Sequence, residues 1–354
     1  MKKERVAYFD YFWVFATLSV IVLHTAIQFW FMDDPRGMAW NIANLYSCFV
    51  RWGVPIFLMI SGALFLSRQI PTKTLYTKYI PRMMVSFLIW SAIYVLVSPW
   101  VSKLFGFKHS TTTDVIQSIL SGYYHMWYIP MIIGIYMCLP VIRQIVKSET
   151  VTRYFLALVF VFAFVIPQVT DIAGVFFPGK IARLAEMCYK AIAATDLFTL
   201  SGFVLYFVCG YLVSQRELSQ KQRRVIYALG AMGFVFTVAL STLGAWFSKK
   251  ACEEFFYATT VNVFFSSLAV FVWFRYHTFD NEKQNRLVAK LSQYSFGVYL
   301  VHVFVLETLH KMGLQTKAFA NIVSIPVVTI VVAVISYLIS WVLNQIPVVK
   351  KWMV

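Results

Sequence analysis

Charged residues are scarce in this 354-residue chain, at 13% against about 25% in average soluble domains. Hydrophobic residues make up 60% and aromatic residues 18%, and the mean hydropathy is +0.70. No polar block is long enough for a separate soluble domain. The composition excludes a soluble, a disordered and a collagen-like protein. It indicates an all-α polytopic membrane protein with one integral membrane domain over residues 1–354.

Cysteines are few, and their spacing is uninformative. The five cysteines form no C-x-x-C pair, so neither a zinc site nor a dithiol motif is indicated, and we expect no metal. The chain also lacks the phosphate-binding loop of ATPases, the glycine fingerprint of dinucleotide enzymes, the G-x-S-x-G elbow and the H-E-x-x-H motif. None of these enzyme classes is therefore supported.

Apolar stretches recur along the whole chain. A helix needs about 20 apolar residues to cross a hydrocarbon core of about 30 Å. This rule predicts about ten transmembrane helices, near residues 8–31, 41–67, 79–101, 127–146, 151–170, 199–214, 224–247, 257–276, 291–310 and 322–345. Two segments between them are long: 102–126, with the polar run HSTTTD, and 171–198, where IARLAEMCYKAIAATD predicts an interfacial amphipathic helix or an ordinary loop.

Acidic residues are half as frequent as basic ones, 15 against 31, which gives a net charge of +16. In a soluble chain this excess would suggest nucleic acid, but in a membrane protein Lys and Arg first report topology. With both termini placed in the cytoplasm, the inward-facing segments carry about twice as many Lys and Arg as the outward-facing ones. We therefore predict cytoplasmic termini, membrane lipids as partners and no nucleic acid; the oligomeric state is left open.

Ionisable side chains inside the predicted spans are rare, and such residues are the default functional candidates. His24, His302 and Glu307 are predicted in the outer half or middle of their spans, Arg51 lies near mid-membrane, and His125 opens the fourth span together with Trp127 and Tyr128. These groups share one depth, although sequence does not determine whether they meet. Each also has a structural interpretation: a hydrogen-bonded core histidine for His24, an Arg51–Glu307 ion pair, and an aromatic belt around His125.

A second candidate region is the basic cluster between spans two and three. It contains Arg68, Lys73, Lys78 and Arg82. Positive-inside topology explains such a cluster. The alternative is an anchor for the phosphates of a 3′-phosphonucleotide, because clustered arginines and lysines neutralise phosphate well.

Five segments of the chain carry family-like signatures: YFDYFWVFATLSVIVLH (8–24), RWGVPIFLMISGALFLSR (51–68), KYIPRMMVSFLIW (78–90), HMWYIPMIIGIYMCLPVIR (125–143) and LSQYSFGVYLVHVFVLE (291–307). Together, and in matching order, they resemble the membrane acyltransferase 3 family, which includes bacterial surface-glycan O-acetyltransferases. The resemblance covers nearly the whole chain.

The family pattern matches this chain residue by residue, with two departures. In the family's first helix a basic residue is followed, after ten intervening positions, by a histidine. His24 matches the histidine, while Trp13 occupies the basic position. In the family's R-x-x-R pair, Arg82 matches the second member and Tyr79 occupies the first. Other recurrent family positions are matched by Asp10, Arg51, Pro55, Ser61, Gly62, Trp127, Tyr128, Tyr136, Pro140, Ser295, Tyr299 and His302.

The resemblance implies a membrane-bound O-acyltransferase of a bacterial-type cell membrane. Such an enzyme transfers an acetyl or other short acyl group from cytoplasmic acyl-CoA to a hydroxyl of an extracytoplasmic glycan or lipid-linked acceptor. It implies catalytic roles for His24, Arg51 and His302, with His24 either general base or acyl-carrying nucleophile. Donor phosphates would bind Lys78, Arg82 and Arg68, and the acceptor would bind His125, Trp127, Tyr128 and Glu307.

A rival hypothesis is a non-enzymatic export protein for a surface polysaccharide, built on the same scaffold. Trp13 and Tyr79 favour it, because both replace basic residues of the family pattern. Detectable binding of CoA distinguishes the two hypotheses, since an exporter needs no acyl donor.

Overall fold

The computed structural model describes residues 7–105, 111–195 and 202–354, and in these ranges the chain is helical without any strand. The helices of the first part are α1 (Ala7–Ala26), η1 (Ile27–Phe29), α2 (Met38–Phe49), α3 (Gly53–Leu66), α4 (Thr72–Thr74), η2 (Leu75–Tyr79), α5 (Ile80–Phe105), α6 (Thr112–Ser121), η3 (Tyr124–Trp127) and α7 (Tyr128–Met137). Those of the second part are α8 (Leu139–Ile145), α9 (Glu149–Phe160), η4 (Val161–Val165), α10 (Ile166–Phe176), α11 (Lys180–Ala193), α12 (Gly202–Gln215), α13 (Gln220–Ser248), α14 (Val261–Tyr276), α15 (Glu282–Lys311), α16 (Asn321–Leu343) and α17 (Pro347–Trp352).

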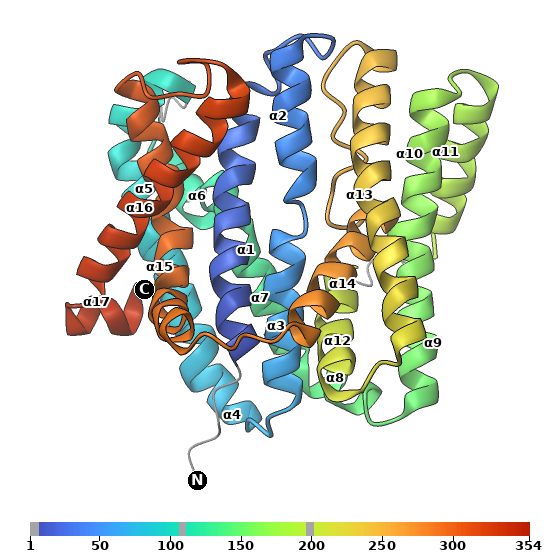
Figure 1. The fold of residues 1–354 in the computed structure, drawn as a ribbon, viewed down its shortest axis with the longest axis horizontal. Helices are drawn as coiled ribbons and strands as arrows, with labels where there is room; N and C mark the ends of the chain where they lie inside the picture. Colours follow the sequence, from blue (N-terminus) through green and yellow to red (C-terminus); the bar gives the residue numbers. More distant parts are fainter. Residues whose placement is uncertain (1–6, 106–110, 196–201) are drawn as a thin grey trace.

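The long helices form one bundle and run roughly side by side between its two ends (Figure 1). Six helical stretches of the described chain are long and apolar enough to cross a membrane: Ala7–Phe29, Met38–Leu66, Thr72–Val97, Glu149–Phe176, Gln220–Ser248 and Asn321–Leu343. A seventh is reached if the bent pair α7 and α8 counts as one span. The chain is therefore a multi-pass membrane protein, as predicted.

Each of the ten predicted spans coincides with helix over most of its length, but not all of them qualify by length and composition. Helices α12 and α14 have 14 and 16 residues, and α15, with 30 residues, is more polar than the six. The number ten and the cytoplasmic termini stay predictions. Lys2, Lys3 and Arg5, which contributed to the charge bias, lie outside the described residues.

Two predicted spans are interrupted. The second breaks at residues 50–52, between α2 and α3, and this break carries Arg51. The fourth bends by 58° between α7 and α8. Pro140 lies in the first turn of α8, where its ring and missing N–H prevent a straight continuation from α7.

The long segments between spans are partly helical. The predicted amphipathic helix is present as α11, which packs against α10 and leaves Ile181, Leu184 and Met187 exposed. In the other segment, α6 begins with a capping box in which Thr111 and Asp114 exchange hydrogen bonds. The start of the HSTTTD run lies outside the described residues.

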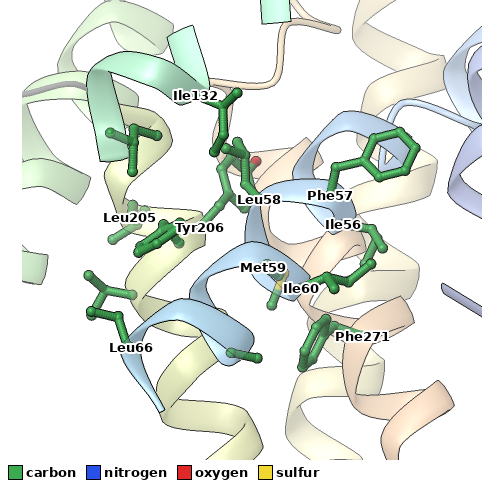
Figure 2. Packing of buried hydrophobic residues seen from close by; sticks show 14 of the residues in the cluster. Ile56, Phe57, Leu58, Met59, Ile60, Leu66, Ile132, Leu205, Tyr206 and Phe271 are labelled. Atoms are coloured by element: carbon green, nitrogen blue, oxygen red, sulfur yellow. The ribbon is translucent and has the colours of Figure 1, made fainter. Parts of the chain in front are cut away.

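The centre of the bundle is the contact between α3 and α12. Figure 2 shows side chains of α3, among them Met59, facing Tyr206 of α12 and Phe271 of α14. Glycine permits this close approach: a Cβ on Gly62 would lie 1.7 Å from the Phe207 carbonyl oxygen, and one on Gly210 would lie 2.1 Å from that of Met59. Small residues let membrane helices pack with backbones nearly touching. Helix α1 packs against α3 of this pair, and α15 packs against α1.

Candidate active site

Three histidines from three separate elements lie together in the bundle. They are His24 of α1, His125 of η3 and His302 of α15. The ring centre of His302 is 5.2 Å from that of His24 and 5.2 Å from that of His125, and the other two rings are 6.3 Å apart. His125 and His302 are buried, and His24 is half-buried. The shared depth predicted for these residues thus corresponds to a real cluster.

Most nitrogens of this cluster are buried without a partner among the described residues. They are Nδ1 of His24, both ring nitrogens of His125 and Nε2 of His302. Nearly all buried polar groups in proteins form hydrogen bonds, so four unpaired nitrogens in one place require an explanation. Within the described ranges, no three His, Cys, Asp or Glu side chains are arranged to hold a metal ion. Neutral imidazoles of this kind can hold or pass on protons.

A cavity of about 510 Å³ opens beside His24. Its size lies in the range typical of small-molecule sites. His125, Trp127 and Tyr128, which were predicted to bind substrate, line it. Seven further aromatic residues line it: Trp30, Phe31, Tyr124, Phe203, Phe256, Tyr257 and Tyr299. Flat apolar rings with a few polar groups between them suit a ligand that has both C–H faces and hydroxyls.

Arg51 lies on the wall of the same cavity, at the break between α2 and α3. Its guanidinium carbon is 3.3 Å from the centre of the Phe256 ring, and its Nη2 donates to Ser47 Oγ at 2.6 Å. Its Nε is buried and, in the described part of the chain, has no partner. The guanidinium group is thus held in place and keeps one N–H without an acceptor.

Glu307 is engaged elsewhere, so the predicted Arg51–Glu307 pair does not form. Tyr123 donates to Glu307 Oε1 at 2.7 Å, and the carboxyl is 4% exposed. Burial and the neighbouring Glu307 carboxylate raise the pKa of Tyr123, which keeps its hydroxyl protonated as a donor. Among the described residues, the cavity lining includes neither Glu307 nor His302.

The loop between α13 and α14 contributes to the cavity, although it was not among the predicted site residues. Glu253, Phe256 and Tyr257 of this loop line the cavity. The Tyr257 hydroxyl donates to Glu253 Oε2 at 2.9 Å, and burial together with this carboxylate raises the pKa of Tyr257 to about 12. The acidic-aromatic run EEFFY next to a predicted span was the available signal, because acidic residues are rare in this chain.

The basic cluster is dispersed in the structure. Arg68 and Lys78 are exposed. Arg82 donates to the carbonyl oxygens of Val354 at 2.7 Å and Lys350 at 3.3 Å, and so holds the end of α17. Arg68 instead borders a separate cavity of about 640 Å³ that Arg143, Gln144 and Lys147 also line.

Trp13 and Tyr79, at the two departures from the family pattern, are partly buried and pack against the hydrophobic core. The Trp13 ring lies 5.2 Å from that of Phe57, and the Tyr79 ring lies 5.3 Å from that of Phe65. Both positions therefore contribute aromatic packing where the family pattern has a cation.

Comparison with known protein families gives a match over nearly the whole chain. The family model described as an acyltransferase domain matches residues 6–343, nearly the whole chain. Searches of curated proteins and of solved structures found no match. The match agrees with the five helix signatures and with the placement of His24 beside a ligand-sized cavity. The chain therefore belongs to the membrane acyltransferase 3 family.

Proposed function

We propose that the protein is an O-acyltransferase that moves an acetyl or other short acyl group from cytoplasmic acyl-CoA to a hydroxyl of an extracytoplasmic surface glycan. A bacterial-type cell membrane is the proposed location. The observation that carries the proposal is the position of His24, whose imidazole borders a 510 Å³ aromatic cavity that Arg51 also lines. A base and a hydrogen-bond donor on the wall of one cavity are the groups that acyl transfer needs.

The reaction assigns a role to each group. His24 takes the proton from the acceptor hydroxyl as its oxygen attacks the thioester carbonyl, and the oxyanion that forms is stabilised by the Arg51 guanidinium. The C–S bond then breaks, and the thiolate leaves and takes up the proton as CoA. If His24 is instead the nucleophile, the acyl group passes through its imidazole to the same hydroxyl. Both routes require His24 beside the cavity.

The cavity wall supports a carbohydrate acceptor. Aromatic rings such as Trp127 and Phe203 offer flat apolar surfaces to the C–H faces of a sugar. Glu253 and Tyr257 offer hydrogen-bond partners for sugar hydroxyls on the same wall. This combination favours a glycan over a purely apolar acceptor such as a sterol.

The donor is proposed to bind at the opposite, cytoplasmic end of the bundle. Arg68 and Lys78 are exposed there and suit the phosphates of acyl-CoA. Arg82 faces the end of α17, and its backbone contacts leave it less free to bind a phosphate. We therefore assign the donor phosphates chiefly to Arg68 and Lys78.

The test uses detergent-purified protein with radiolabelled acetyl-CoA, measuring binding, slow hydrolysis and transfer to a panel of glycans. We expect His24→Ala to fold, to bind donor and to lose turnover about 10²-fold or more. His277→Ala is the matched control, because His277 is exposed and stacks on Trp273. Turnover at the wild-type rate by His24→Ala would refute the catalytic assignment. Absence of any acetyl-CoA binding by the wild type would favour the exporter of a surface polysaccharide.

A further inference from the structure

The hydrogen atom on His302 can be placed from its surroundings. Nδ1 of His302 lies 2.7 Å from the backbone carbonyl oxygen of Tyr299. A carbonyl oxygen only accepts hydrogen bonds, so Nδ1 must carry the hydrogen. In a neutral imidazole the second nitrogen is then an acceptor. His302 therefore presents a lone pair at Nε2.

That lone pair has no donor among the described residues, and Nε2 is buried. A buried acceptor without a donor costs free energy, so the site favours a neighbour that can donate. His24 is such a neighbour, with its ring centre 5.2 Å away and its Nδ1 also buried and unpaired in the described chain. Because the His24 ring lines the cavity while Nδ1 is buried, the accessible part of the ring carries Nε2.

We propose that His302 is a positioning residue: its Nε2 accepts a hydrogen bond from Nδ1–H of His24, through one bridging water or after a small turn of either ring from the described geometry. This bond holds His24 in the tautomer whose Nε2 lone pair faces the cavity. This inference rests on the proposed function of His24 and deepens it. The backbone of α15 orients His302, and His302 in turn orients His24. A base whose second nitrogen is held by a hydrogen bond presents one defined tautomer to the substrate.

His125 is the competing donor, because its ring is also 5.2 Å from that of His302 and both its nitrogens are unpaired within the described ranges. Its surroundings differ, since the rings of Tyr94, Tyr123 and Tyr299 pack around it. If His125 supplied the hydrogen, the tautomer of His24 would not depend on His302. The two possibilities are therefore separable by experiment.

The first experiment reads the tautomer and needs no acyl transfer. The protein is labelled with ¹⁵N-histidine, and the chain has only six histidines to resolve. His24→Gln assigns the signals of His24. We expect wild-type His24 to show a protonated Nδ1 and an unprotonated Nε2. The reverse pattern, or a His24 tautomer unchanged in His302→Asn, overturns the proposal.

The second experiment uses two substitutions of His302, each of which retains a polar group near only one of the two ring nitrogens. His302→Gln keeps a polar group that can accept near the position of Nε2, whereas His302→Asn keeps a donor near Nδ1 but has no atom at Nε2. We expect kcat to fall about 10²-fold in His302→Asn, with KM changed less than threefold, and to stay within about tenfold of wild type in His302→Gln. His277→Gln is the control for the chemical change. Equal losses in both variants, or a greater loss in His302→Gln, contradict the positioning role.

The two readouts distinguish this inference from the proposed function. The expected tautomer in a protein without any acyl transfer would support the His302–His24 contact and refute the acyltransferase proposal. Acyl transfer with the opposite tautomer would support the enzyme and refute the positioning role. If His302→Asn fails to fold, the tautomer of wild-type His24 and the kinetics of His302→Gln still test the positioning role of His302.

Discussion

The guanidinium carbon of Arg51 lies 3.3 Å from the centre of the Phe256 ring. This contact joins the break between α2 and α3 to the loop between α13 and α14, and both residues line the cavity beside His24. A cation stacked on an aromatic face away from water is stabilised by about 2 kcal/mol. The contact therefore holds Arg51 at the cavity wall.

Arg51→Lys keeps the positive charge but loses the planar stacking surface and the Nε donor. We expect kcat of acyl transfer to fall about tenfold or more, because the oxyanion would lose an oriented donor. Phe256→Leu, which keeps an apolar side chain, should lower stability by about 1–2 kcal/mol and weaken Arg51 orientation. Steady-state kinetics and thermal midpoints in detergent check both, and wild-type kcat in Arg51→Lys would exclude the role of Arg51.

The Tyr123–Glu307 hydrogen bond is expected to stabilise the contact between the segment before η3 and α15. Tyr123→Phe leaves Oε1 of a buried carboxyl without its donor, in addition to Oε2, which already lacks a partner in the described chain. We expect a loss of about 1–3 kcal/mol in unfolding free energy. The double variant Tyr123→Phe with Glu307→Met should recover part of the lost unfolding free energy, since both polar partners are removed together. Additive losses in this cycle would argue against the pairing.

Gly210 is expected to be intolerant of any side chain. Gly210→Ala places a Cβ 2.1 Å from the Met59 carbonyl oxygen, so α3 and α12 must separate. We predict destabilisation by about 1–3 kcal/mol or loss of folded protein. Gly134→Ala in α7 is the matched control: among the described atoms none lies within 4 Å of its added Cβ, and alanine favours helix by about 0.5–1 kcal/mol. Equal thermal midpoints for the two variants would contradict this view of the α3–α12 contact.

Arg82 and Lys78 both belong to the predicted phosphate cluster, but we expect them to have different roles: Arg82 holds α17, and Lys78 binds the donor. Arg82→Ala removes the donors to the carbonyls of Lys350 and Val354, so hydrogen exchange over 347–354 should accelerate. Lys78→Ala should leave that exchange unchanged and weaken acetyl-CoA binding about threefold to tenfold. Unchanged exchange in Arg82→Ala would refute its contact with α17, and unchanged donor affinity in Lys78→Ala would refute its assignment to the donor.

Hydropathy along the sequence was sufficient for the class of fold, because the need to bury about 20 apolar residues per crossing is a local property of the chain. It also placed His24, His125 and His302 at one depth, since depth follows from position within a span. Orientation around each helix axis was not accessible in this way. The alternative pairing of Arg51 with Glu307 was wrong for this reason: the two share a depth, yet Arg51 stacks on Phe256 and Glu307 binds Tyr123.

The sequence by itself therefore determined that this chain is a helical membrane protein of an acyltransferase family, and it singled out the rare polar residues as candidates for the site. Tertiary structure alone decided which of them meet. It brought Glu253 and Tyr257 from a loop to the cavity, directed Arg82 to the end of α17, and set the His302 ring beside His24. The physical reason is that such contacts depend on helix packing, which residues far apart in the chain determine together.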